Sequence, residues 1–160
     1  MSTIKIGRHS LKISNPDKVI FPDDGLTKRH LVDYYGRISD VMLSHLKGRP
    51  LTLHRFPEGI RGEGFYQQRA PDFLPNWISR KQLQAKRTDS LTHIICHNAA
   101  SLAYLANLAC ITLHIWLSRA DMAGRPDRMI FDLDPPENRF ELARRCARET
   151  SRRRRESPRR

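Results

Sequence analysis

The apolar residues of this 160-residue chain change their spacing along the sequence, and this change limits the folds that are open to it. Between residues 28 and 47 they recur every three or four positions, which predicts one amphipathic helix that ends at Gly48 and Pro50. Residues 99–110 are mostly apolar and follow Asn98, a residue type favoured at helix N-caps. We therefore expect a second, buried helix there.

Other segments have the alternation or the short apolar runs that are typical of strands. Residues 51–56 alternate, and residues 128–134 form a strand-like segment followed by two prolines. Asn138 and Glu141 have the spacing of a capping box and predict a C-terminal helix of about ten residues. The irregular mixture of helices and strands indicates an α/β or an α+β domain. Shorter strand candidates are residues 10–14, 65–68 and 93–96. Residues 19–21 form a short apolar run, and residues 111–117 are expected to be extended.

Composition excludes several classes of protein. Hydrophobic residues make up 39% of the chain, and no apolar run is long enough to span a bilayer, so we expect no membrane association. The first residues lack the apolar stretch of a signal peptide. Three cysteines without a regular spacing argue against a disulfide framework and favour a reducing, cytoplasmic setting.

The positive charge of the chain is unevenly distributed. The formal net charge is +12, and residues 139–160, with ten arginines and three glutamates, supply +7 of it. A basic body attracts polyanions such as nucleic acids, although a solvated surface would have the same charge. Residues 151–160 are rich in arginine and almost devoid of apolar residues, so we expect a disordered tail there and a folded domain over residues 1–150.

Two acidic residues stand out chemically, because Asp132 and Asp134 alternate with Phe131 and Leu133 in the segment 128–134. On a strand the two carboxylates would project from one face while the apolar pair enters the core. Paired carboxylates repel unless a cation lies between them or one is protonated, and Mg²⁺ or Mn²⁺ is the usual partner of such oxygen ligands. Two solvated acids at a strand end remain an alternative interpretation.

Many short blocks, in order over residues 10–145, resemble the polymerase domain of bacterial DNA ligase D, a member of the archaeo-eukaryotic primase superfamily. The resemblance implies an α+β domain with a mixed or antiparallel sheet, flanking helices and DNA repair by non-homologous end joining. The blocks are Asn-Pro-Asp-Lys-Val-Ile-Phe-Pro (15–22), Asp-Gly-Leu-Thr-Lys (24–28), Leu-Lys-Gly-Arg-Pro-Leu (46–51), Arg-Phe-Pro-Glu-Gly (55–59), Gly-Glu-Gly-Phe-Tyr-Gln (62–67), Leu-Ala-Asn-Leu (105–108), Leu-His-Ile-Trp-Leu-Ser-Arg (113–119), Arg-Pro-Asp-Arg (125–128) and the Asp132–Asp134 pair.

The resemblance implies a catalytic role for two of these residues and a role in nucleotide binding for two others. Asp132 and Asp134 are expected to be the first two carboxylates of a two-metal site that takes Mn²⁺ or Mg²⁺ and performs phosphoryl transfer. His114 is expected to contact the nucleoside triphosphate, and Arg55 to belong to the same polar wall. From sequence alone, His114 would equally be a core or edge histidine.

The resemblance assigns five further residues to DNA. Asn15, Lys18 and Lys28 are expected to grip a 5′-phosphate at a break or gap, since ammonium and amide groups suit that anion. Phe65 and Tyr66 are expected to stack on bases, a contact worth about 1–3 kcal/mol each. Without the resemblance, the first three would be solvated surface residues and the two aromatics strand core.

The blocks cover about the first half of the family's domain. The Ser-Gly-Gly-Lys-Gly phosphate loop and the third metal carboxylate of the family are missing, so we expect a truncated or frameshifted product with little or no polymerase activity alone. It remains open whether the chain is an enzyme completed by a partner, a non-catalytic module that binds DNA ends with a 5′-phosphate, or a degraded remnant. The family further implies Ku and a DNA ligase chain as partners, in the bacterial cytoplasm at the nucleoid.

Overall fold

The computed structural model describes residues 2–84, 90–136 and 139–156. The chain divides into two compact units, Met1–Asp127 and Arg128–Arg160. The second unit contains one helix, α4 (Phe140–Glu156), among its described residues. The elements of the first unit are β1 (Ser2–Ile6), β2 (His9–Ile13), β3 (Val19–Phe21), β4 (Leu26–Thr27), α1 (Lys28–Arg37), α2 (Ser39–Leu46), β5 (Pro50–Arg55), β6 (Phe65–Gln67), β7 (Arg80–Gln84), β8 (Ser90–Ile95), α3 (Ala99–Asn107) and β9 (Cys110–Ile115).

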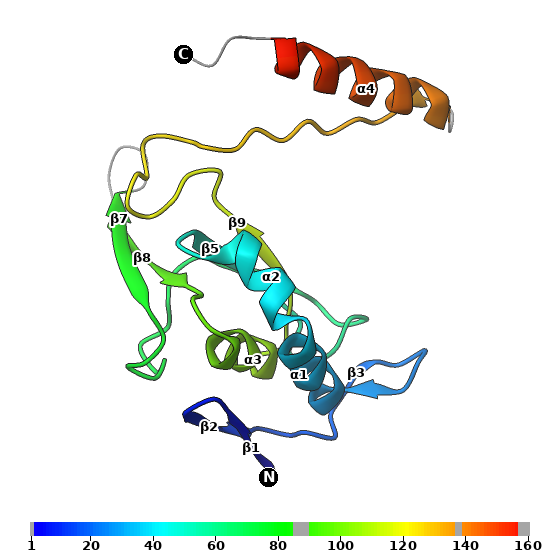
Figure 1. Cartoon of the computed structure of the whole chain (residues 1–160). Coiled ribbons are helices and arrows are strands. Elements are labelled where there is room, and N and C mark those ends of the chain that lie inside the picture. Colours follow the sequence, from blue (N-terminus) through cyan, green and yellow to red (C-terminus); the bar gives the residue numbers. More distant parts are fainter. Residues whose placement is uncertain (1, 85–89, 137–138, 157–160) are drawn as a thin grey trace. The chain divides into compact units, whose positions relative to one another are not determined.

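Strand β5 is the centre of an antiparallel five-stranded sheet (Figure 1). One edge of β5 pairs with β9 along nearly its whole length. The other edge is shared, because β8 pairs with Pro50 and Leu51 while β6 pairs with the stretch from Leu53 to Arg55. β7 extends the sheet beyond β8, and β1–β2 and β3–β4 form separate hairpins. The α+β class and the antiparallel sheet agree with the sequence prediction.

The core lies between the sheet and the helices. Leu51 and Leu53 of β5 are each 1% exposed and belong to one apolar cluster with Val32 of α1 and Leu105 of α3. α3 begins as expected, since the Oδ1 atom of Asn98 accepts a hydrogen bond of 2.8 Å from the backbone N–H of Ser101. The buried helix expected over residues 99–110 is therefore present as α3, with Leu102, Leu105 and Ala106 fully buried.

The single helix expected over residues 28–47 is two helices. α1 ends and α2 begins at Ile38, whose φ of −89° and ψ of 3° lie outside the helical range. The Tyr35 hydroxyl of α1 donates a 2.6 Å hydrogen bond to the Ile111 carbonyl of β9, and burial raises its pKa. Apolar spacing continues through a break of this kind, because both helices must still bury a face against the same core.

The strand expected over residues 128–134 is absent from the described residues. Residues 127–135 form no strand, and Phe131 and Leu133 are 59% and 38% exposed rather than buried in the core. A strand needs a neighbour for its N–H and C=O groups, and no described segment pairs with this one. The sequence pattern was therefore insufficient to predict the structure here.

Helix α4 is longer than the helix of ten residues predicted from the capping-box pattern. It has 17 residues and ends at Glu156, so residues 151–156 are helical where a disordered tail was expected. Glu141 and Arg144 form an ion pair of 2.7 Å across its first turn. Asn138 of the expected capping box lies outside the described residues.

Two expectations from composition can be compared with the structure. Cys96 and Cys110 are buried in the core, and burial raises the pKa of each thiol to about 12, so they are unreactive packing residues. None of the helices that the structure describes is both long and apolar enough to cross a bilayer.

Candidate functional site

Three cationic side chains lie close together in the first unit, where α1 begins. Lys28 is only 7% exposed, and its ammonium group donates a 3.3 Å hydrogen bond to the Ser14 hydroxyl. Burial lowers the pKa of Lys28, and the positive charges of Lys18 and Arg55 lower it further. The three residues therefore form a cluster of positive charge with one carboxylate partner, Glu58 on Lys18, and we name this cluster the cationic pocket (Lys18, Lys28 and Arg55).

The loop between β2 and β3 holds Lys18 and Lys28 in this pocket. Asn15 is exposed and adopts a left-handed φ of 48°, and its carbonyl accepts a 3.1 Å hydrogen bond from the Lys18 N–H. The Lys18 carbonyl in turn accepts a 2.8 Å hydrogen bond from the Lys28 N–H. This backbone relay places the two lysines, ten positions apart in sequence, on adjoining segments.

Asn107, at the end of α3, anchors the same loop from the core side. Its Oδ1 atom accepts hydrogen bonds from the Ser14 N–H (3.0 Å) and hydroxyl (3.3 Å). Its Nδ2 atom donates to the Lys12 carbonyl at 3.2 Å. Asn107 and Lys28 are 8% and 7% exposed, so both ends of the link from α3 to the Lys28 ammonium are buried, whereas Ser14 between them is exposed.

Arg55 is fixed in the wall of the pocket at the end of β5. Its Nε–H donates to the Leu108 carbonyl at 2.9 Å and its Nη1 group to the Gln67 side-chain oxygen at 2.7 Å. The guanidinium carbon lies 5.2 Å from the centre of the Phe65 ring, within the range of a cation–π contact. Burial lowers the pKa of Arg55.

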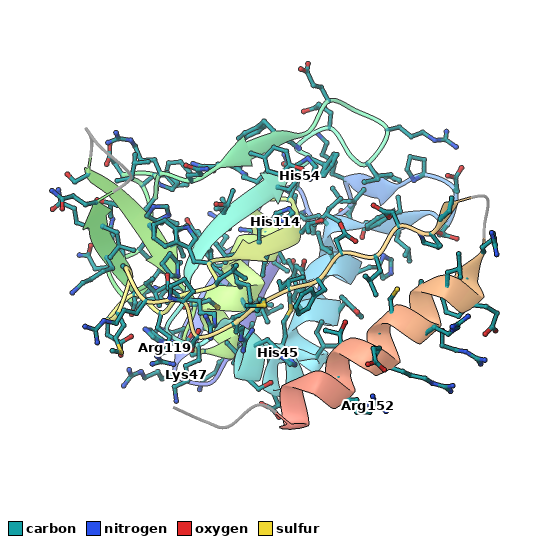
Figure 2. The ribbon with its side chains drawn as sticks, turned by 90° about the horizontal axis from the view of Figure 1, so that it is seen from above. His45, Lys47, His54, His114, Arg119 and Arg152 are labelled. Carbon is teal, nitrogen blue, oxygen red and sulfur yellow. The ribbon has the colours of Figure 1, made fainter. Side chains whose placement is uncertain are left out.

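A second group of side chains lies on the other face of the same strands. Tyr66 stacks on His54 with ring centres 4.1 Å apart and planes 15° apart, and His54 also contacts Phe56 at 4.4 Å. The ring centre of His114 in β9 lies 5.5 Å from that of Tyr66 and 6.3 Å from that of His54. Figure 2 shows His54 and His114 near each other on the paired strands β5 and β9. We call these four residues, Tyr66, His54, Phe56 and His114, the imidazole face.

Phe65 and Tyr66 do not act as one aromatic pair. Phe65 is opposite Arg55 and Tyr66 is opposite His54 in the β5–β6 register, so the two rings lie on opposite faces of β6. Phe65 is 44% and Tyr66 64% exposed, so neither is the buried strand core that the alternative interpretation required. One aromatic side chain thus borders the cationic pocket and the other the imidazole face.

Asp132 and Asp134 belong to the second unit, and both side chains are exposed. Because their segment forms no strand, the alternation that would place both carboxylates on one face does not apply. Carboxylate oxygens are ligands that Mg²⁺ and Mn²⁺ prefer, so the type of donor fits these ions. Within residues 2–84, 90–136 and 139–156, no group of three or more His, Cys, Asp or Glu side chains is arranged to hold a metal ion.

Sequence reasoning missed Glu58, Asn107 and His54 as parts of these sites. Glu58 pairs with the Lys18 ammonium at 2.7 Å, and its position in the Arg-Phe-Pro-Glu-Gly block was the available signal. The contacts of His54 depend on the strand register, which periodicity does not give. The polar side chain of Asn107 in an otherwise apolar helix was a signal for a buried hydrogen-bonding role.

The fold and the sequence have been compared with known proteins. A solved structure described as the polymerase domain of Mycobacterium tuberculosis ligase D in complex with DNA superimposes with a TM-score of 0.66 and 35% identity, over 68% of this chain and 38% of that one. In architecture the chain is therefore a polymerase-type α+β protein. The family described as LigD, primase-polymerase domain, matches residues 27–156, and the chain belongs to this family.

Relatives from several bacteria agree with this assignment. The multifunctional non-homologous end joining protein LigD of Mycolicibacterium smegmatis is 35% identical over 129 residues, which is 79% of this chain and 17% of that protein. The bifunctional non-homologous end joining protein LigD of Bacillus subtilis is 32% identical over 126 residues, 79% of this chain and 20% of that protein. The chain thus spans about one fifth or less of the length of these relatives.

Proposed function

We propose that this chain binds DNA ends or gaps through a terminal 5′-phosphate, as the end-recognition part of a repair polymerase. The observation that carries the proposal is the cationic pocket. Lys28 is buried near Lys18 and Arg55, and burial together with these two positive charges lowers its pKa, so the three cations repel one another. A phosphate dianion would relieve this repulsion and accept several charge-assisted hydrogen bonds.

The aromatic residues support DNA as the molecule that carries the phosphate. Phe65 borders the cationic pocket and Tyr66 belongs to the imidazole face on the other side of β6, and both rings are exposed, as base stacking requires. The relative whose structure superimposes on this chain was solved in complex with DNA. Asn15, exposed at the mouth of the loop, offers an amide donor to the same phosphate.

We assign the imidazole face to the incoming nucleoside triphosphate. His114 is exposed on β9, and its imidazole suits an anionic phosphate chain. Asp132 and Asp134 would supply two carboxylates to Mg²⁺ or Mn²⁺, whose role when bound is to neutralise charge on the transferred phosphoryl group. In this proposal the ligand set is completed by groups outside the described residues, and the phosphoryl transfer is template-dependent nucleotide addition.

The cellular context follows from the relatives. They are described as non-homologous end joining proteins, which favours broken chromosomal DNA in the bacterial nucleoid as the site of action. Ku and a DNA ligase chain are the partners that such a reaction requires. A non-catalytic end-binding module is the second candidate. It is favoured because Asp132 and Asp134 are the two carboxylates proposed for a metal site, and the described residues contain no group of three or more side chains arranged to hold a metal ion.

The test of end recognition is fluorescence anisotropy with gapped DNA that differs only in its 5′ end, phosphate or hydroxyl. We expect the full 160-residue chain to prefer the phosphate, and Lys28→Met to lose about ten- to a hundredfold of that preference, as expected for a charge-assisted hydrogen bond. Lys81→Met removes the same charge from β7, an exposed strand of the sheet, and is the matched control. Equal affinity of the unaltered chain for both ends would refute the proposal.

The two candidates are separated by nucleotide addition and by metal binding. A repair polymerase extends the primer in the presence of Mn²⁺, whereas an end-binding module does not. For the 160-residue chain we expect phosphate-dependent binding without measurable extension. Asp132→Asn/Asp134→Asn should reduce Mn²⁺ binding followed by electron paramagnetic resonance and leave the phosphate preference unchanged.

A further inference from the structure

We propose that Glu58 is an internal competitor for the 5′-phosphate, which occupies Lys18 in the free protein and is displaced when a phosphate binds. The inference rests on the proposed function of the cationic pocket. It adds a residue that sets the affinity of this pocket from within the chain. In this proposal the Glu58 carboxylate occupies the position beside Lys18 at which the phosphate binds.

The contact itself is a direct ion pair. The Glu58 Oε2 atom lies 2.7 Å from the Lys18 ammonium, the length of a charge-assisted hydrogen bond. The side chain of Lys18 is 30% exposed and that of Glu58 is 75% exposed, so the pair is at the mouth of the pocket. The charge of Lys18 lowers the pKa of Lys28, which means that Lys18 acts electrostatically on the buried lysine.

The backbone holds Glu58 in this place. The turn after β5 is tied to the end of α3 by the Phe56 N–H, which donates to the Ala109 carbonyl at 2.9 Å. It is tied to β3 by the Ile60 N–H, which donates to the Ile20 carbonyl at 2.8 Å. Because Lys18 directly precedes β3, these two bonds bring Glu58 and Lys18 together.

Gly59 makes this close approach possible. Its φ is +89°, in the region that favours glycine, and a Cβ atom there would lie 3.1 Å from the carbonyl oxygens of Val19 and Ile20. The turn therefore packs backbone against backbone beside the pocket. The backbone on both sides of Glu58 is therefore held in place, so its exposed side chain starts from a fixed position beside Lys18.

The competition follows from charge. Glu58 balances Lys18. Within the described part of the chain, the side-chain hydrogen bonds of the buried Lys28 and the partly buried Arg55 go to a hydroxyl, a carbonyl and an amide oxygen, and not to a carboxylate. A phosphate dianion that reaches all three cations gains more electrostatic energy than Glu58 loses when its ion pair with Lys18 breaks. The phosphate therefore displaces Glu58. The displacement and the remaining repulsion between carboxylate and phosphate both weaken phosphate binding.

The experiment compares Glu58→Gln with Glu63→Gln in the full chain. Glu63 is an exposed acid in the same β5–β6 connection, so both variants change the net charge equally. We expect Glu58→Gln to bind 5′-phosphorylated gapped DNA about three- to tenfold more tightly, as estimated for removing one charge near the ligand in a partly screened site. Its affinity for the hydroxyl-ended DNA should change no more than that of Glu63→Gln.

A double-variant cycle makes the test specific. With Lys18→Ala in place, Glu58→Gln should lose most of its effect, because the competitor no longer has its lysine. The inference is overturned if Glu58→Gln binds the phosphate less tightly, if Glu63→Gln tightens binding equally, or if the full effect persists without Lys18. None of these results contradicts the proposed function as long as the unaltered chain prefers 5′-phosphate over 5′-hydroxyl DNA and the Lys28→Met variant loses this preference.

Discussion

Phe65 and Tyr66 are neighbours in sequence and lie on opposite faces of β6, one against Arg55 and the other against His54. The proposed site is therefore divided by an edge strand. Arg55 of the cationic pocket and Phe65 lie on one side of it, and the imidazole face lies on the other. This division predicts that the two aromatic residues have separable roles.

Phe65→Ala should lower the preference for a 5′-phosphate, because Arg55 loses the ring that borders it. Tyr66→Ala should weaken binding of phosphate-ended and hydroxyl-ended DNA alike, by about five- to a hundredfold for the loss of one base-stacking contact. Anisotropy with both substrates measures the two effects. Identical profiles for the two variants would contradict the division of the site.

Asn107→Ala should loosen the loop between β2 and β3, which carries Asn15 and Lys18. The substitution leaves the Ser14 N–H and the Lys12 carbonyl without their partner, at a cost of about 1–3 kcal/mol in the free energy of unfolding for a buried polar group. Asn98→Ala at the other end of α3 removes an N-cap and costs about 0.5–2 kcal/mol. Urea unfolding should detect both losses, but only Asn107→Ala should reduce the 5′-phosphate preference.

Lys28→Met should stabilise the free protein while it weakens phosphate binding. The folded-state pKa of Lys28 is lowered, so the unfolded chain binds the proton more tightly, and the charge opposes folding at neutral pH. This penalty fades as pH rises from the lowered pKa through the ordinary value of 10.5. Thermal unfolding at pH 7.5 should give a higher Tm for Lys28→Met than for the unaltered chain. A lower Tm would mean that the buried ammonium is net stabilising.

The burial of the His93 imidazole leads us to expect a loss of stability in mild acid. It is 1% exposed beside Trp116, and among the described residues neither ring nitrogen has a hydrogen-bond partner of good geometry. Burial lowers its pKa, with a smaller opposing effect from the Leu51 backbone. Because the unfolded chain then binds more protons below pH 6.5, the free energy of unfolding should fall there, by up to about 1.4 kcal/mol per pH unit.

Urea unfolding at pH 7.5 and 5.5 measures this effect. His93→Phe keeps a ring for Trp116 to pack against and should flatten the difference between the two pH values. His45→Gln changes an exposed histidine of α2 and is the matched control. If His93→Phe and His45→Gln have the same pH dependence, His93 is not the group responsible.

Local patterns predicted the elements whose residues carry their own signals. Asn98 caps α3, and the alternation of residues 51–56 became β5. The predictions were wrong where the structure of a segment depends on a neighbouring segment. Residues 128–134 have the composition of a strand, yet no described segment offers them hydrogen bonds. The break at Ile38 was missed for a related reason, since apolar spacing continues across it.

The sequence by itself determined the α+β class, the family blocks, and the residue types suited to phosphate and bases, because these depend on composition and local spacing. Only the tertiary structure decided that Lys28 is buried and that Phe65 and Tyr66 lie on opposite faces of β6. It also decided that Glu58 forms an ion pair with Lys18. Those facts depend on strand register and on the docking of distant segments. Both arise from long-range packing, which no local pattern of residues records.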